Sequence, residues 1–205
     1  LSTNTVVVII PVGTNPAGVG VNAVGTRAYV ANGGSNTVSV IDTASNTVVA
    51  TVPVGTTPFA AAVNPAGTKV YVANFGTNNV SVIDTSTNTV TATIPGGNAP
   101  SSVAVHPAGT RAYVSNQNSQ DVTVINTATN AVIATVPIGG VASGIAVAPN
   151  GSRVYVVSPG ASNNTIFTID TSTNTVVNSY SSGSSTNNDT QFLGVDIPGS
   201  RIYAA

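Results

Sequence analysis

A repeat of 42 residues runs through nearly the whole chain of 205 residues and limits its fold more than any other feature. Tyrosines, prolines and glycines each recur at this interval. The three series are Tyr29, Tyr71, Tyr113, Tyr155; Pro11, Pro53, Pro95, Pro137; and Gly25, Gly67, Gly109, Gly151. Because independent landmarks share one period, the chain consists of similar modules that stack on their neighbours.

Each repeat contains the signals of four short strands. In the first copy, runs rich in Val, Ile, Thr and Tyr fall at about 19–22, 27–32, 37–42 and 47–53, separated by Gly, Pro, Asn and Ser. No window shows a helical period. Four strands in a unit of about 40–45 residues are typical of β-propeller blades, whereas β-helix coils, the alternative, are usually shorter. We therefore predict an all-β, single-domain propeller with antiparallel blades at about 19–53, 61–95, 103–137 and 145–180.

The recurring segments YVAN, VSVIDT, NTV and NPAGT resemble the YVTN family of β-propeller repeats, and the resemblance covers nearly the whole chain. It implies a prokaryotic secreted or cell-surface protein, a group that includes archaeal surface-layer proteins. It implies no single biochemical activity. The tail 181–192 breaks the period, and Asn126 stands where the other copies have Asp.

The two ends of the chain predict partial blades. Residues 3–12 align with a fourth strand, because Pro11 takes the register of Pro53, and residues 193–205 align with a first and a second strand. These segments lack one third strand, so we expect a piece of a larger ring or array; a compact five-bladed ring with a three-stranded closing blade is the alternative. The absence of an initiator Met and of a signal peptide also favours a mature or excised piece.

Composition excludes several classes of protein. Only 5% of the residues are charged and the net charge is −1, which gives no field to attract nucleic acid or an anionic membrane. The hydrophobic fraction of 41% argues against a disordered chain, and no apolar run approaches the roughly 20 residues that span a bilayer. No cysteine is present, so disulfides and thiolate chemistry are excluded. Low charge with abundant Thr, Asn and Ser favours an extracellular or cell-surface location.

All five basic residues occupy one repeat position at the start of the second strand. If the second and third strands form a hairpin, each cation faces the residue that ends the third strand. The predicted cross-strand pairs are Arg27 with Asp42, Lys69 with Asp84, Arg153 with Asp170, and Arg111 with the neutral Asn126. We interpret these pairs as structural, since each contributes only about 0.2–1 kcal/mol. A ring of basic side chains that binds anions is the alternative.

The polar motifs give little sign of catalysis. The segment Asp-Thr-x-x-Asn suits a tight turn, and calcium binding is the sharper alternative, with one carboxylate in each loop. His106 lies in a turn, with no Cys, Glu or second His to complete a metal site. The repeated tyrosines are interpreted as core, with a sugar-stacking ladder as the alternative. No nucleotide-binding glycine motif occurs, and the lack of Trp weakens a quinone-dependent propeller. We predict no catalytic residue, no metal and no cofactor.

Variable loops mark the predicted binding face. Loops between the second and third strands, and the links from one blade to the next, differ among the copies and lie together at one end of the blades. Phe75 and Phe59 are the conspicuous apolar residues there, and each can anchor a partner or tuck between blades. Amide side chains suited to sugars or peptides add to this face; the candidates are Asn32, Asn74, Asn116 and Asn118.

The sequence therefore favours a non-catalytic extracellular propeller that acts as a structural or adhesive scaffold or interaction module. The expected partners are other surface proteins or glycans, or further copies of the chain that pair through open blade edges; nucleic acid and membrane insertion are not expected. A carbohydrate- or peptide-binding domain that uses the variable loops is the second hypothesis. A propeller hydrolase or lyase with its site in the central channel is the third.

Overall fold

The computed structural model describes residues 5–160, 163–184, 193–196 and 201–204 of the chain. These residues contain no helix, and hence none that could cross a membrane. Blade 1 comprises β1 (Pro16–Val21), β2 (Arg27–Asn32), β3 (Thr37–Asp42) and β4 (Thr47–Pro53). Blade 2 comprises β5 (Pro58–Val63), β6 (Lys69–Asn74), β7 (Asn79–Asp84) and β8 (Thr89–Pro95). Blade 3 comprises β9 (Pro100–Val105), β10 (Arg111–Asn116), β11 (Asp121–Asn126) and β12 (Ala131–Pro137). Blade 4 comprises β13 (Ile145–Val147), β14 (Arg153–Ser158), β15 (Asn163–Asp170) and β16 (Thr175–Ser184).

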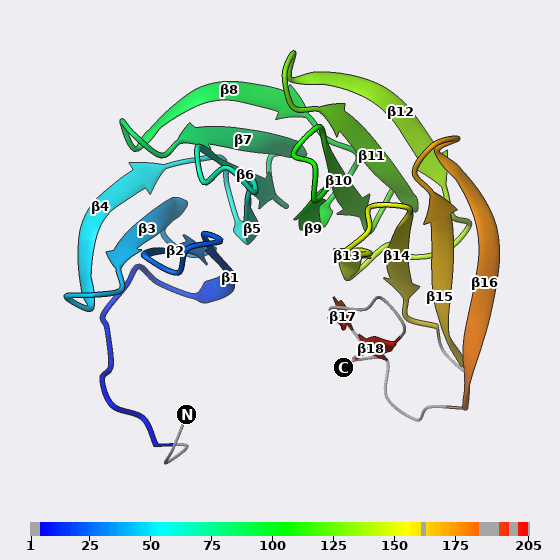
Figure 1. Cartoon of the computed structure of the whole chain (residues 1–205), viewed down its shortest axis with the longest axis horizontal. Helices are drawn as coiled ribbons and strands as arrows, with labels where there is room; N and C mark the ends of the chain where they lie inside the picture. Colours follow the sequence, from blue (N-terminus) through cyan, green and yellow to red (C-terminus); the bar gives the residue numbers. More distant parts are fainter. Residues whose placement is uncertain (1–4, 161–162, 185–192, 197–200, 205) are drawn as a thin grey trace.

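The four sheets stand side by side around an axis. In each sheet the strands pair antiparallel in sequence order, from β1-β2-β3-β4 to β13-β14-β15-β16. Figure 1 shows the blades as an arc, with β1, β5, β9 and β13 nearest the centre and β4, β8, β12 and β16 on the outside. This arrangement confirms the predicted all-β propeller of four-stranded blades. The period of 42 residues predicts it because one repeat is one blade, and a blade buries its faces only against neighbours.

Strand pairing follows the register expected from the repeat. In blade 1, Arg27 pairs with Asp42 and Val30 with Ser39 across the β2–β3 hairpin. Lys69 with Asp84, Arg111 with Asn126 and Arg153 with Asp170 occupy the same register in the other blades. An asparagine or glutamine in the left-handed conformation closes the first three of these hairpins, at Asn36, Asn78 and Gln120. Asn tolerates positive φ better than most residues, which explains its abundance in these loops.

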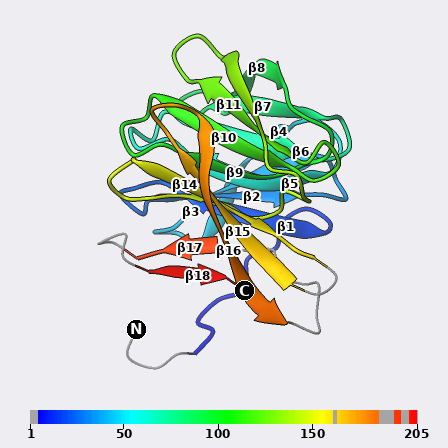
Figure 2. The ribbon, with the colours of Figure 1, turned by 90° about the vertical axis from the view of Figure 1, so that its right-hand side faces the viewer.

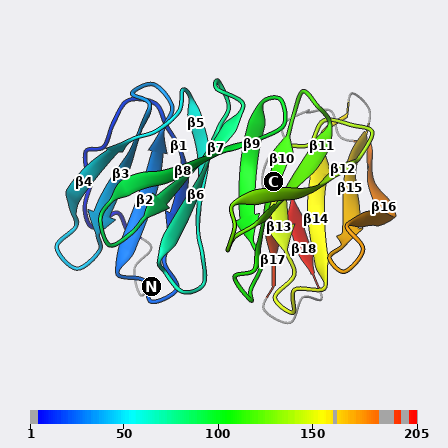
Figure 3. The ribbon, with the colours of Figure 1, turned by 90° about the horizontal axis from the view of Figure 1, so that it is seen from above.

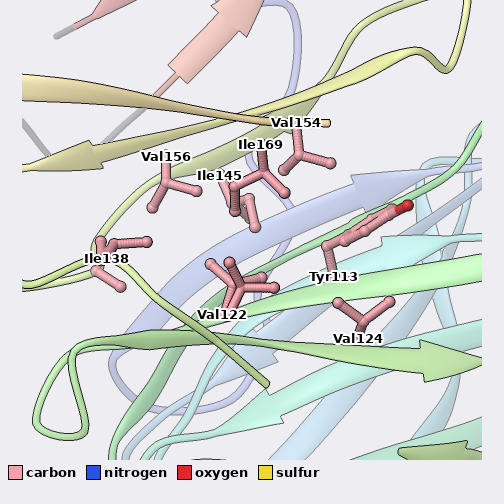
Figure 4. Packing of buried hydrophobic residues seen from close by; sticks show 10 residues of the cluster. Tyr113, Val122, Val124, Ile138, Ile145, Val154, Val156 and Ile169 are labelled. Carbon is pink, nitrogen blue, oxygen red and sulfur yellow. The ribbon is translucent and has the colours of Figure 1, made fainter. Parts of the chain in front are cut away.

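The core lies between the blades rather than inside one sheet. Tyr113, Val122 and Val124 of blade 3 pack against Val154, Val156 and Ile169 of blade 4, as Figure 4 shows. The two interfaces before this one repeat the pattern with Tyr71 and Tyr29. Tyr29, Tyr71 and Tyr113 are at most 2% exposed, which agrees with their interpretation as core residues, whereas Tyr155 is half-buried. The Val-rich strands therefore fold as blades because each sheet needs a neighbour on its face.

The innermost strands of blades 1 and 2 approach each other at glycines. A Cβ atom on Gly18 would lie 2.6 Å from the carbonyl oxygen of Phe59, and one on Gly20 would lie 2.6 Å from that of Ala61. Only glycine permits this close approach of backbone to backbone. The tight contact narrows the arc at the axis, where the candidate site lies.

The last described strands form a smaller sheet. β17 (Leu193–Val195) pairs with β18 (Ile202–Ala204), which gives the first and second strands expected for residues 193–205. Figure 2 shows the two strands side by side, and β17 lies against β13 and β14 of the last complete blade. The prediction of a fourth strand at residues 3–12 is wrong: residues 5–12 belong to no strand, and residues 1–4 lie outside the described part. An outer strand needs a third strand beside it, and no described strand pairs with residues 5–12.

The loops fall into two groups at opposite ends of the strands (Figure 3). The amides of Phe75 and Gly76 donate to the carbonyls of Thr57 and Thr56, at 3.0 Å each, so the β6–β7 loop lies against the link between blades 1 and 2. At the other end, the Thr85 hydroxyl donates to the carbonyl of Gly67 at 2.7 Å and joins the remaining two loops of blade 2. The variable loops therefore share one end of the propeller, which we call the variable face.

Candidate functional site

A groove of about 270 Å³ opens at the axis, beside the variable face. The first residues of the inner strands of blades 1 to 3 and one residue of the link before β13 form its wall. The lining residues are Ala17, Gly18, Val19, Phe59, Ala60, Ala61, Ser101, Ser102, Val103 and Ser143. In the repeat register, Ala17, Phe59, Ser101 and Ser143 are equivalent positions. We call this the axial groove.

Irregular backbone aims the side chains of the axial groove. The β5–β6 register shifts between Pro58 and Ala60, and the β9–β10 register shifts where Ser101 lies. Phe59 and Ser101 therefore sit at bulges, which redirect a side chain out of the regular pleat. Two residues before each bulge, Thr57 and Ala99 have left-handed backbone, with φ of 50° and 58°. Such conformations cost energy and often occur at functional sites.

Buried serines fix the polar side of the axial groove. Ser101 is 4% exposed, and its hydroxyl lies 3.1 Å from the carbonyl oxygen of Ala142 and 3.2 Å from that of Ser143. The Ser115 hydroxyl, from β10, also donates to the carbonyl of Ser143. These bonds join blade 3 to the link that enters blade 4. They hold Ser143 in the groove wall through its backbone, so its own hydroxyl is not needed for that purpose.

The basic residues lie at the opposite ends of the strands. Arg27 forms an ion pair with Asp42, and Arg153 forms one with Asp170 at 2.5 Å, as predicted. The prediction of an ion pair between Lys69 and Asp84 is wrong. The Lys69 Nζ instead donates to the carbonyl of Thr127, in blade 3, at 2.8 Å. Arg111 likewise donates to the carbonyl of Thr171, in blade 4. These two cations therefore join neighbouring blades, whereas Arg27 and Arg153 pair within their own sheets.

The conserved turn motif is held by carboxylate hydrogen bonds. Asp84 accepts bonds from the Ser86 hydroxyl at 2.5 Å and from the Ser86 amide at 2.8 Å. These bonds, with smaller contributions from Thr87 and Lys69, lower the pKa of Asp84 below its ordinary value. Asp42 and Asp170 have lowered pKa values for the same reason, with bonds from Ser45 and Ser172 leading. The carboxylates of these turns therefore accept hydrogen bonds from the turn itself. Within the described residues no cluster of acids suits a metal.

His106 connects blades 3 and 4. Its Nδ1 accepts the amide of Ala108 at 3.0 Å, so the Nε2 carries the proton and donates to the carbonyl of Gly151 at 3.0 Å. Both ring nitrogens are therefore occupied by backbone groups. This agrees with the structural interpretation of the lone histidine.

The predicted binding residues separate into two groups. Phe59 lines the axial groove, and its ring packs on Phe75 with centroids 6.1 Å apart. Asn118 is exposed in the β10–β11 loop, away from the groove lining. The prediction of a binding role is wrong for Asn32, Asn74 and Asn116, because all three are 0% exposed. Their amide groups donate inward, for example from Asn74 to the Ser81 hydroxyl at 2.9 Å, and so brace the hairpin instead of facing a partner.

Sequence reasoning missed Ser101, Ser102 and Ser143. The signal was present in the variable links TTPFA and NAPSS, because the position of Phe59 carries Ser in the next two repeats. Variable loops on a constant scaffold are frequent places for binding residues. That these positions converge on one groove required the curvature of the arc.

Comparison with known proteins gives the family. The model of the family described as "Lactonase, 7-bladed beta-propeller" matches residues 21–138, more than half of the chain. The chain belongs to this lactonase propeller family. The structure "Kuenenia stuttgartiensis Hydrazine Synthase" superposes with a TM-score of 0.88 at 23% sequence identity, which shows a shared fold. The superposition covers 95% of this chain but 56% of that one, so the chain spans little more than half its length. No curated protein matches the sequence.

Family membership corrects the predicted function. We expected a non-catalytic structural or adhesive scaffold, and this prediction is wrong because the family is one of enzyme-related propellers, named for lactonase. The resemblance to YVTN repeats remains broadly consistent with the propeller. The repeat pattern did not indicate this because a fold does not determine function, which depends on a few positions of a repeat protein.

Proposed function

We propose that this chain provides the substrate-binding wall of a propeller hydrolase that acts on cyclic esters, with the axial groove as the binding site. Membership of the lactonase propeller family supports the reaction class. The groove supports the location, and one observation carries it: Phe59, Ser101 and Ser143, the variable members of one repeat position, line a single cavity. Left-handed links and bulges position the first two of them.

The groove residues suit binding and orientation of an ester. A serine hydroxyl can donate a hydrogen bond to a carbonyl or ring oxygen, and an aromatic ring can cover the apolar face of a small ring. The described lining contains no carboxylate or imidazole. The group that accepts a proton from the attacking water therefore lies beyond this lining, and these side chains act by holding the substrate.

Hydrolysis at constant pH, measured by titration of released acid, tests this function on a panel of γ- and δ-lactones. We expect release above the buffer blank. Phe59→Ala and Ser143→Ala should raise KM about tenfold with a smaller change in kcat, since each removes one binding contact. Ser179→Ala, an exposed serine of β16, is the matched control. Folded protein that releases no acid from any lactone would disprove the proposal.

The extracellular or cell-surface location and the partners expected there, surface proteins or glycans, stay part of this proposal. Low charge and abundant Thr, Asn and Ser support them. Immunodetection in fractionated source cells tests the location, and a signal confined to the cytosol would contradict it.

A further inference from the structure

The axial groove has two chemically different sides. Blades 1 and 2 supply Ala17 and Phe59 at the first repeat position of the wall, whereas blades 3 and 4 supply Ser101 and Ser143. The next position changes in the same way, from Gly18 and Ala60 to Ser102. One side therefore presents carbon and the other presents hydroxyl groups.

The apolar side is held rigidly. Phe59 is half-buried, follows the left-handed Thr57, and leaves the regular pleat at a bulge. The ring of Phe75 supports it from the adjacent loop at 6.1 Å, with the planes tilted by 38°. A ring fixed in this way offers a preformed apolar surface, which lowers the entropic cost of binding.

The polar side keeps hydroxyl groups available. Ser101 and Ser115 use their hydroxyls on the carbonyls of the link that enters blade 4. Ser102 is half-buried and Ser143 is 3% exposed, and both line the groove. Neither forms a side-chain hydrogen bond with another residue in the described ranges. Their hydroxyls can therefore donate to a ligand without breaking an internal bond.

The basic side chains of the repeat start at the ends of their strands farthest from this wall. Lys69 pairs at the far end of β6, about four residues along the strand from the level of Ala60, which corresponds to about 13 Å. Lys69 and Arg111 also donate hydrogen bonds to carbonyls of the next blade. The described lining thus holds neutral donors alone, and an anion placed there would exchange part of its hydration for hydroxyl groups without gaining an opposite charge.

From this two-sided wall, and resting on the proposed function, we infer that the substrate is an uncharged cyclic ester with an apolar substituent. Its carbonyl or ring oxygen lies at Ser102 and Ser143, and its substituent lies on Phe59. Phosphorylated or carboxylated sugar lactones are poor ligands of this groove.

Lactams test this inference apart from turnover, because they keep the ring and the carbonyl but resist hydrolysis. The probes are 2-piperidone and its 6-pentyl and 6-carboxy derivatives, with affinity measured by ligand-observed NMR titration. We expect the pentyl compound to bind about tenfold tighter than the parent ring, because it buries several CH₂ groups on Phe59, and the carboxylate to bind more weakly than the parent.

Variants assign the two sides of the groove. Phe59→Ala should remove the advantage of the pentyl compound, with Phe59→Leu retaining part of it, while Ser143→Ala should weaken all three probes. Phe167→Ala, a half-buried phenylalanine of β15, and Ser179→Ala are matched controls that should leave the three affinities unchanged. Circular dichroism confirms that each variant is folded.

Three results would overturn the inference: tighter binding of the carboxylate than of the pentyl compound, a pentyl advantage that survives Phe59→Ala, or no binding of any lactam to folded protein. The proposed function fails separately. Lactams that bind in the expected order, without turnover of any lactone, would remove the hydrolase and leave the ligand class. Preferred turnover of a phosphorylated lactone would support the hydrolase and contradict the inferred ligand class.

Discussion

Tyr71 places a phenol hydroxyl inside the interface between blades 2 and 3, where it has no hydrogen-bond partner. Burial raises the pKa of Tyr71 to about 12 from 10.0. The neutral form is therefore favoured in the folded state. This preference leaves the free energy of unfolding unchanged below pH 10, and the free energy of unfolding falls as the pH rises towards 12. The ring stabilises the interface, whereas burial of the unpaired hydroxyl destabilises it.

Tyr71→Phe should increase the free energy of unfolding by about 1 kcal/mol at pH 8, because it removes an unpaired buried hydroxyl and keeps the ring. It should also reduce the loss of stability between pH 10 and pH 12. Urea unfolding followed by circular dichroism at pH 8 and pH 11 measures both effects. Tyr203→Phe, at a 58% exposed position, should change neither; a destabilised Tyr71→Phe would show that the hydroxyl has a partner.

Asp84 offers a second test at the residue scale, because Asn126 already performs its turn role in blade 3. Asn126 accepts bonds from the amides of Ala128 at 2.9 Å and Thr129 at 3.1 Å. Asp84 does the same with a lowered pKa, so its contribution to stability is present above about pH 4 and is lost as the pH falls.

We therefore expect Asp84→Asn to match the parent protein at pH 7 and to lose less stability at pH 3. Asp84→Ala should be destabilised at pH 7, since it leaves the turn amides without an acceptor. Thermal unfolding of the three proteins at both pH values checks this. If the Asn and Ala variants are equally unstable at pH 7, the negative charge, rather than the turn hydrogen bonds, holds the loop.

At the scale of the element, the links between blades combine strain with function. Thr57 is β-branched and has φ of 50°, a conformation in which Asn15, the equivalent residue of the first repeat, is more easily accommodated. The Thr57 amide is anchored by the Asn36 side chain at 2.9 Å, and its carbonyl accepts from Phe75. The link thus holds a costly backbone that aims Phe59 into the groove.

Thr57→Asn should raise the free energy of unfolding by about 1 kcal/mol, because it keeps the backbone and relieves the β-branched side chain. Thr56→Asn, one residue earlier and outside the left-handed conformation, is the control and should bring no such gain. Chemical denaturation measures both variants. A loss of stability in Thr57→Asn would mean that the threonine side chain makes a contact that outweighs the strain.

On the scale of the whole molecule, stability is shared between neighbouring blades. Val70 and Val72 of blade 2 are 0% exposed because blade 1 covers them, whereas Ala28 and Val30, their equivalents in blade 1, are only half-buried. Cations and His106 add bonds from one blade to the next. Such an array behaves approximately as a line of units coupled to nearest neighbours.

We expect amide hydrogen exchange to be slowest in β6, β7, β10 and β11 and faster in β2 and β3, which have a neighbouring blade on one face only. Exchange measured by mass spectrometry on peptides from each blade gives the order. Arg111→Met should speed exchange in blades 3 and 4 more than in blade 1, because its bond joins those two blades. Uniform exchange in all blades would indicate a single cooperative unit instead.

The sequence by itself determined the propeller, the strand pairing and the turns. The 42-residue period, the Tyr and Val spacing and the Asp-Thr-x-x-Asn turn depend on contacts within one repeat or with the next, so one copy contains the information for all. Pairing of Arg27 with Asp42 followed from counting along a hairpin.

Only the tertiary structure decided which polar residues line the axial groove. Asn74 and Phe59 are both conspicuous beside the variable loops, yet one is buried under the link and the other lines the axial groove. Ser101 and Ser143 lie 42 residues apart and meet because four sheets curve around an axis. Curvature arises from packing between blades, a non-local property that no single repeat encodes.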